Sequence, residues 1–118
     1  MNVRFSRGKI RFRIDTAELD RLIDRSPIEE SVFFAADDFL YFTIMSVAGG
    51  DRLFKISKQG NNISLEVSAL ALENLKSNLA HSDFLSDSIY FAEGKSVKVV
   101  LEIDLHDPML KNKKVNRN

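Results

Sequence analysis

The chain of 118 residues contains no cysteine, which excludes a disulfide framework, catalysis by a thiolate and a zinc site with cysteine ligands. Its opening residues lack the apolar stretch of a secretory signal, and no apolar run approaches the ~20 residues that span a bilayer. Neither a phosphate-cradling glycine motif nor a nucleophilic triad is present. We therefore expect a cytoplasmic protein without membrane contact, and the sequence predicts neither an enzyme nor a cofactor.

Net charge is also absent, because 17 basic residues balance 17 acidic ones. The distribution is uneven, since all the acids lie between Asp15 and Leu110 and both ends are basic. Basic ends either bind a polyanion or pair with the acidic middle of the chain once it folds. We favour internal pairing, and a net charge of zero disfavours nucleic acid as a partner.

A pattern that recurs after 53 residues is the most informative feature that is present. In each half a turn glycine precedes an alternating apolar strand, and a capping side chain then leads into a helix with apolar residues three apart. The turn glycines are Gly8 and Gly60, and the positions matched by the shift are Ile10 and Ile63, Phe12 and Leu65, Ile14 and Val67, Asp15 and Ser68, Leu19 and Leu72, and Leu22 and Leu75. The repeat indicates two similar units that complete a shared core.

The predicted fold class is α+β, with the order β-β-α-β-β stated twice. Strands are expected at residues 3–5, 9–14, 28–34, 39–46, 52–57, 63–67, 88–91 and 97–104, with helices after Asp15 and Ser68. Closely spaced hairpins favour a curved antiparallel sheet or a barrel, with the two helices packed on it. We expect one domain over residues 1–108 and a disordered basic tail over residues 109–118.

The segment Phe39–Met45 is apolar on both faces of its strand and must be covered twice. Either the sheet curves into a barrel or a second subunit covers the outer face. We favour the second subunit, with an interface formed by Phe39, Tyr41, Thr43 and Met45. The function predicted is that of a small, non-enzymatic binding or assembly module that forms a homo-oligomer, with an unidentified protein as a further partner left open.

A row of basic side chains, Lys9, Arg11 and Arg13, projects from the opposite face of the strand that carries Ile10. On a sheltered surface such a row binds phosphate or carboxylate groups. The first alternative function is therefore a binder of small anionic molecules or nucleic acid. As a structural role, the row pairs across strands with Glu29 or Glu30, and we favour that role.

A second alternative function is metal-dependent. Glu102, Asp104 and His106 alternate along the last strand, so their side chains share one face if the strand continues that far. Two carboxylates and an imidazole are suitable ligands for a divalent ion. In the simpler interpretation, which we favour, they are solvated residues at the end of a strand.

Residues 8–22 resemble the opening of a family of small, uncharacterised bacterial proteins, which begin "R-G-N-S-I-R-L-R-L-T" and continue "x-S-E-V-x-x-L". Residues 28–30 are similar to the "V-E-E" of that family, and residues 100–105 to its "L-x-E-K-D-F". Ile103 replaces the usual lysine, and Asp107 stands where a cysteine is common. The resemblance implies one compact domain and supplies no chemistry.

Overall fold

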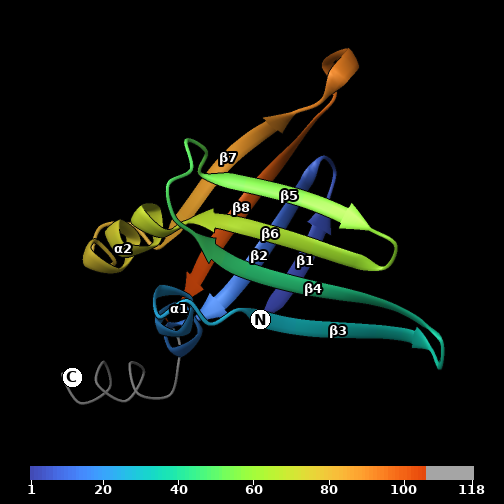
Figure 1. The fold of residues 1–118 in the computed structure, drawn as a ribbon, viewed down its shortest axis with the longest axis horizontal. Coiled ribbons are helices and arrows are strands. Elements are labelled where there is room, and N and C mark those ends of the chain that lie inside the picture. The colour runs from blue at the N-terminus through green and yellow to red at the C-terminus, as the bar shows by residue number, and fades with distance from the viewer. Residues whose placement is uncertain (106–118) are drawn as a thin grey trace.

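The computed structural model describes residues 1–105. In chain order the elements are β1 (Asn2–Ser6), β2 (Lys9–Asp15), α1 (Thr16–Ile23), β3 (Ile28–Ala35), β4 (Asp38–Val47), β5 (Phe54–Gln59), β6 (Asn62–Ser68), α2 (Ala69–Ser77), β7 (Phe84–Tyr90), a short 3-10 turn (Ala92–Gly94) and β8 (Ser96–Asp104) (Figure 1). The α+β class and the repeated order β-β-α-β-β are confirmed. The tail expected at residues 109–118 lies outside the described residues.

The strands form two open, four-stranded sheets, not a barrel. Sheet A has the order β1-β2-β8-β7, and sheet B the order β3-β4-β6-β5. The pairs at the edges are antiparallel hairpins, as expected, whereas the central pairs β2–β8 and β4–β6 are parallel. The sequence could not indicate these central pairs, because they join strands that no tight turn connects.

Each sheet combines one hairpin from the first half of the chain with one from the second. The two sheets are related by exchanging each strand with its counterpart in the other half of the chain, β1 with β5, β2 with β6, β3 with β7 and β4 with β8. This exchange turns the strand order of sheet A into that of sheet B. The central pair of sheet A runs from Lys9 opposite Lys98 to Asp15 opposite Asp104. Neither half therefore contains a complete sheet, and each requires strands of the other.

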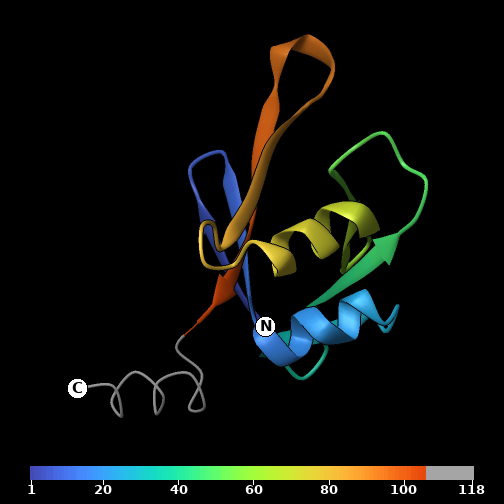
Figure 2. The ribbon, with the colours of Figure 1, turned by 90° about the vertical axis from the view of Figure 1, so that its left-hand side faces the viewer.

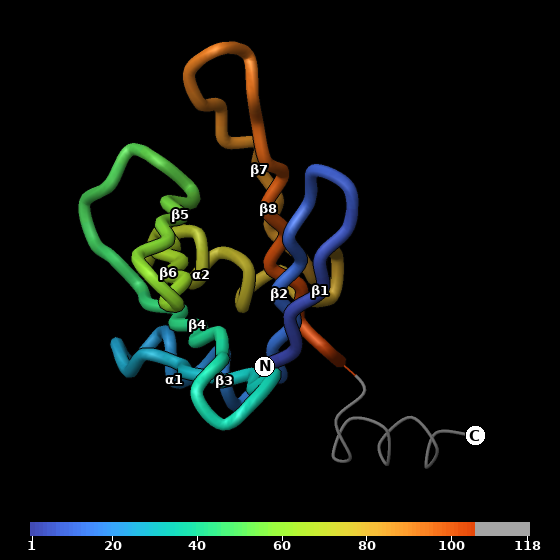
Figure 3. The backbone as a smooth tube through the Cα atoms, turned by 90° about the vertical axis from the view of Figure 1, so that its right-hand side faces the viewer, coloured from blue at the N-terminus to red at the C-terminus, as the bar shows by residue number. Residues whose placement is uncertain are grey.

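The two sheets lie as separate layers with their apolar faces toward each other (Figure 3). Strand alternation directs Phe12 of sheet A and Phe42 of sheet B into this space, where their rings meet edge to face at 6.4 Å. The most deeply buried side chains are Phe12, Ile14, Val99, Leu101 and Ile103 from sheet A, Ile28, Phe42, Ile44, Leu65 and Val67 from sheet B, and Leu19, Leu22 and Leu72 from the helices. The repeated apolar positions thus build one shared core.

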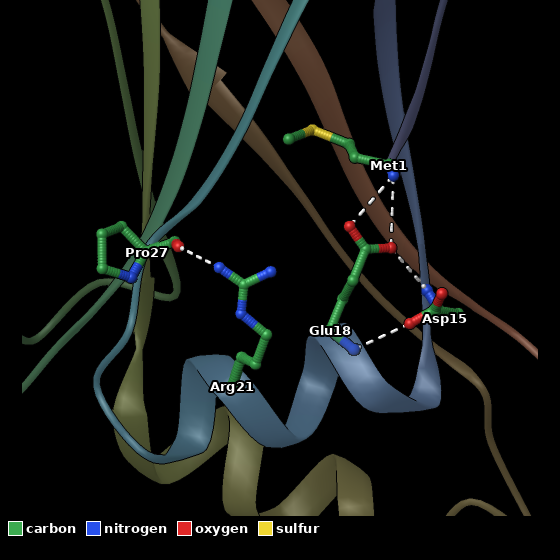
Figure 4. Close-up of polar contacts among 5 residues, drawn as sticks. All are labelled: Met1, Asp15, Glu18, Arg21 and Pro27. Carbon is green, nitrogen blue, oxygen red and sulfur yellow. Dashed lines mark hydrogen bonds and ion pairs between the residues drawn. The ribbon is translucent and has the colours of Figure 1, made fainter.

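Both helices close the same end of the space between the sheets (Figure 2). Helix α1 begins in a capping box: the Asp15 carboxylate accepts from the Glu18 amide at 2.7 Å, and the Glu18 carboxylate accepts from the Asp15 amide at 3.0 Å (Figure 4). The Met1 ammonium also donates to Glu18, at 3.0 Å. An ion pair between Lys76 of α2 and Asp20 of α1 joins the two helices.

The open end lies opposite the helices, where an apolar groove separates the sheets. Its lining combines Ile10, Phe91 and Val97 from the sheet A side with Ile56 and Ile63 from sheet B. One boundary there differs from expectation: β7 begins at Phe84, four residues before the strand expected at 88–91. The polar residues Ser86, Asp87 and Ser88 concealed its alternation.

Candidate functional site

The outer face of sheet A carries the basic row found in the sequence. Because Phe12 and Ile14 face the core, the residues between and before them face outward. We call this surface the basic face; it comprises Arg4, Lys9, Arg11, Arg13 and Lys98, with the carboxylates of Glu102 and Asp104. Five cations against two carboxylates leave a net positive charge of three.

Two arginines of the basic face pair with acids of β8. Arg11 Nε lies 3.8 Å from Glu102 Oε2, and Arg13 Nη2 lies 3.5 Å from Asp104 Oδ1. Internal pairing therefore occurs, but the expected partners on β3 are wrong, because β3 belongs to the other sheet. Half-exposed pairs of this kind contribute about 0–1 kcal/mol each, so they orient the arginines more than they stabilise the fold.

The metal hypothesis shares residues with this arrangement. Glu102 and Asp104 lie on one face, as their spacing requires, and each forms an ion pair with an arginine. His106 lies outside the described residues. Over residues 1–105 no three potential metal-binding side chains gather in one place. A metal site thus stays a prediction that depends on His106.

Like charges face each other directly on the basic face. Arg4 lies opposite Arg11 on neighbouring antiparallel strands, and Lys9 lies opposite Lys98 on parallel ones. Directly opposed like charges destabilise a sheet by roughly 0.2–1 kcal/mol per pair. Arg4, Lys9 and Lys98 have no acidic partner within residues 1–105 to offset that cost.

A depression of about 210 Å³ lies on this face, at the point where β2, β8 and β7 run side by side. It is lined by Lys9, Arg11, Phe84, Ser86, Lys98, Val100 and Glu102. Three of these seven side chains are cations and one is an aromatic ring that is 49% exposed. The sequence missed Lys98, Phe84 and Ser86 as neighbours of the basic row, because only the parallel pairing of β2 with β8 brings them there.

The far end of the β3–β4 hairpin forms a second surface, which projects beyond the rest of sheet B at the lower right of Figure 1. Phe33 and Phe34 are 64% and 65% exposed. The Phe33 ring packs beside that of Phe39 at 5.4 Å between centroids. We call this end of the hairpin the hairpin patch; it comprises Val32, Phe33 and Phe34 of β3 and Phe39, Leu40 and Tyr41 of β4. The patch covers both faces of the hairpin, since Val32 and Leu40 lie on the core side and Phe39 and Tyr41 on the outer side.

The four interface residues expected on β4 all lie on its outward face. Phe42 and Ile44 face the core, so Phe39, Tyr41, Thr43 and Met45 alternate to the other side, where they are half-buried. Phe33 and Phe34 were not among the interface residues expected from the sequence. The apolar run at residues 32–34 was the sequence signal that could have identified them. That these residues are exposed follows only from the position of β3 at the edge of sheet B.

The phenol of Tyr41 has a perturbed pKa. A hydrogen bond from its phenol to the Glu29 carboxylate raises the pKa of Tyr41, and desolvation and the negative charge of Glu29 act in the same direction. Glu29 lies opposite Thr43, one step along from Tyr41 on the outer face of sheet B. Glu29 therefore borders the hairpin patch next to Tyr41.

Another depression, of about 550 Å³, lies at the connection between β4 and β5. Its charged lining consists of Asp51, Arg52, Lys55 and Glu66, and Lys55 pairs with Glu66 at 3.9 Å. The two signs balance, so this depression selects no ligand by charge.

These features define an α+β protein of two facing sheets, with a basic face on one sheet and an apolar hairpin on the other. The chain belongs to a family of unknown function, DUF7009, which it matches over residues 1–114. The family supports the resemblance found in the sequence and brings no chemistry with it. No curated protein matches the chain. Within residues 1–105 no helix is both long enough and apolar enough to cross a bilayer.

Proposed function

We propose that the protein is a small cytoplasmic assembly module, without enzymatic activity, that binds a second copy of itself through the hairpin patch. The observation that carries this proposal is the exposure of Phe33 and Phe34 beside the half-buried rings of Phe39 and Tyr41. Single exposed apolar residues are ordinary, whereas a contiguous exposed patch is typical of an interaction surface.

The backbone of β3 supports the same proposal. This strand is an edge of sheet B, and of its eight residues only Ile28 is buried. An exposed edge offers unpaired amide and carbonyl groups to a further strand, and β3 is the longest of the four edge strands. No proline interrupts it.

A second copy fits this surface because a two-fold interface must be complementary to itself. Antiparallel pairing of β3 with β3 of the other copy continues sheet B across the symmetry axis and satisfies both edges. It also brings the phenylalanines of both copies together. The patch itself carries no charged side chain that would oppose its own copy.

We expect a dissociation constant on the order of 1 μM, which corresponds to about 8 kcal/mol of net binding free energy. Phe33 and Phe34 are the main contributors, since each is mostly exposed in the single chain and burying one phenylalanine contributes about 1.5–3 kcal/mol.

Sedimentation velocity over a range of concentrations tests the proposal. The wild-type chain should change from monomer to dimer, whereas Phe33→Ser combined with Phe34→Ser should stay monomeric with an unchanged melting temperature. Leu70→Ser is the matched control, because Leu70 is 66% exposed on α2 and lies outside the patch. A wild-type chain that stays monomeric at about 500 μM contradicts the proposal, as does a dimer of undiminished affinity in the double variant.

A further inference from the structure

We propose that the depression on the basic face binds the phosphate group of a small aromatic phosphate monoester. This site lies on sheet A and is independent of the hairpin patch on sheet B. Three features support this site: converging cations, an arginine with an exposed guanidinium, and the rest of the lining.

Three cations converge on the depression from two strands. Lys9 and Arg11 alternate on β2, and Lys98 lies directly opposite Lys9 on β8. A lysine supplies a compact charge, and an arginine adds a planar fork of donors that matches phosphate oxygens. An anion held between Lys9 and Lys98 would remove the repulsion that the fold otherwise retains there.

Arg11 is the arginine that lines the depression. The Arg11 side chain is 37% exposed, although its Nε atom is buried and has no hydrogen-bond partner in the described part of the chain. A ligand in the depression would therefore reach the exposed part of the guanidinium and not Nε. The 3.8 Å separation between Arg11 Nε and Glu102 is an ion pair and is too long for a hydrogen bond. Glu102 thus orients the Arg11 guanidinium without occupying its donors.

The remaining lining selects the rest of the ligand. The half-exposed ring of Phe84 offers a flat apolar surface on which an aromatic ring can stack, and the Ser86 hydroxyl adds one donor and acceptor. A volume of about 210 Å³ suits a phosphate monoester with one aromatic ring system more than a larger ligand. Adenosine monophosphate is therefore a suitable probe.

The acids of the basic face argue against a nucleic-acid strand. A polynucleotide requires a continuous track of cations along its phosphates. Here Glu102 lines the depression itself, and Asp104 follows beside Arg13. The two carboxylates thus interrupt the row of cations, which does not form a continuous track.

Isothermal titration calorimetry at low salt tests the proposal with four probes: adenosine monophosphate, adenosine, inorganic phosphate and an oligothymidylate. We expect one molecule of adenosine monophosphate per chain, weaker binding of inorganic phosphate and no binding of adenosine. No heat with adenosine monophosphate at about 10 mM overturns the proposal. Binding of the oligothymidylate without adenosine monophosphate overturns it in favour of a nucleic-acid surface.

Variants connect the binding to these residues. Lys9→Gln combined with Lys98→Gln removes two opposed cations, so the fold should be retained while the affinity for adenosine monophosphate falls at least about tenfold. Lys55→Gln combined with Lys58→Gln changes the net charge equally on β5 of the other sheet and should bind as the wild type does. Equal affinity in the two double variants contradicts the site. The Phe33→Ser, Phe34→Ser chain should bind adenosine monophosphate normally, which separates this test from that of self-association.

Discussion

Phe42→Ala tests most severely whether the two facing sheets share one core. The Phe42 side chain is 1% exposed. The centroid of its ring lies 6.4 Å from that of Phe12 and 6.2 Å from that of Phe5, and both of these rings belong to the opposite sheet. Truncating a buried phenylalanine removes its transfer free energy and leaves a cavity, at a cost of about 3–5 kcal/mol. That is a large share of the roughly 5–15 kcal/mol that stabilises a domain of this size.

Urea denaturation followed by far-ultraviolet circular dichroism measures the effect. The free energy of unfolding should fall by about 3–5 kcal/mol, and the melting temperature by roughly 12–20 °C. Phe33→Ala is the matched control, since Phe33 is mostly exposed on the neighbouring strand and its loss should cost under about 1 kcal/mol in the monomer. A cost below about 1 kcal/mol for Phe42→Ala, or equal costs for both variants, would refute the shared core.

Two further predictions concern single polar side chains. Glu18→Ala removes one acceptor of the capping box and the partner of the Met1 ammonium, so it should lower the free energy of unfolding by about 1–2 kcal/mol. Glu18→Gln keeps an acceptor for the Asp15 amide and should lower the free energy of unfolding by less. Equal losses of stability for the two variants in thermal melts would contradict the capping role. In a Tyr90→Phe chain, which leaves Tyr41 as the sole tyrosine, titration of the phenolate absorbance should give a pKa above the ordinary value, and Glu29→Ala should bring it down. Because the pKa of Tyr41 is higher in the folded state than in the unfolded state, the stability that this bond contributes is complete below about pH 10 and disappears as the pH rises through the folded-state pKa. An unchanged pKa of Tyr41 in the Glu29→Ala variant would contradict the bond.

The local structure was predictable because its signals are local. The alternation of Ile10, Phe12 and Ile14 specified a strand with one apolar face, and the spacing of Asp15 and Glu18 specified where α1 begins. Hairpins followed for the same reason, since a short turn determines which strands are neighbours. These signals were sufficient for the α+β class and for the two β-β-α-β-β units.

The long-range pairing was not predictable, and the candidate sites depend on it. Nothing near Arg11 in the sequence indicates that Glu102 and Lys98 are its neighbours, because β2 and β8 come from opposite ends of the chain. Two sets of residues that the sequence treated as separate hypotheses therefore lie on one face. Similarly, the exposure of Phe33 follows from the place of β3 at a sheet edge, which no pattern within β3 indicates.

Self-association through the edge of sheet B is tested most directly by cross-linking, since the chain has no cysteine of its own. Ser31 and Ser57 are exposed serines on the outer face of the two opposite edge strands, β3 and β5. With a short bismaleimide, Ser31→Cys should give a covalent dimer at low protein concentration, and Ser57→Cys should not. Equal cross-linking of the two variants, or none from Ser31→Cys, would contradict the proposed assembly.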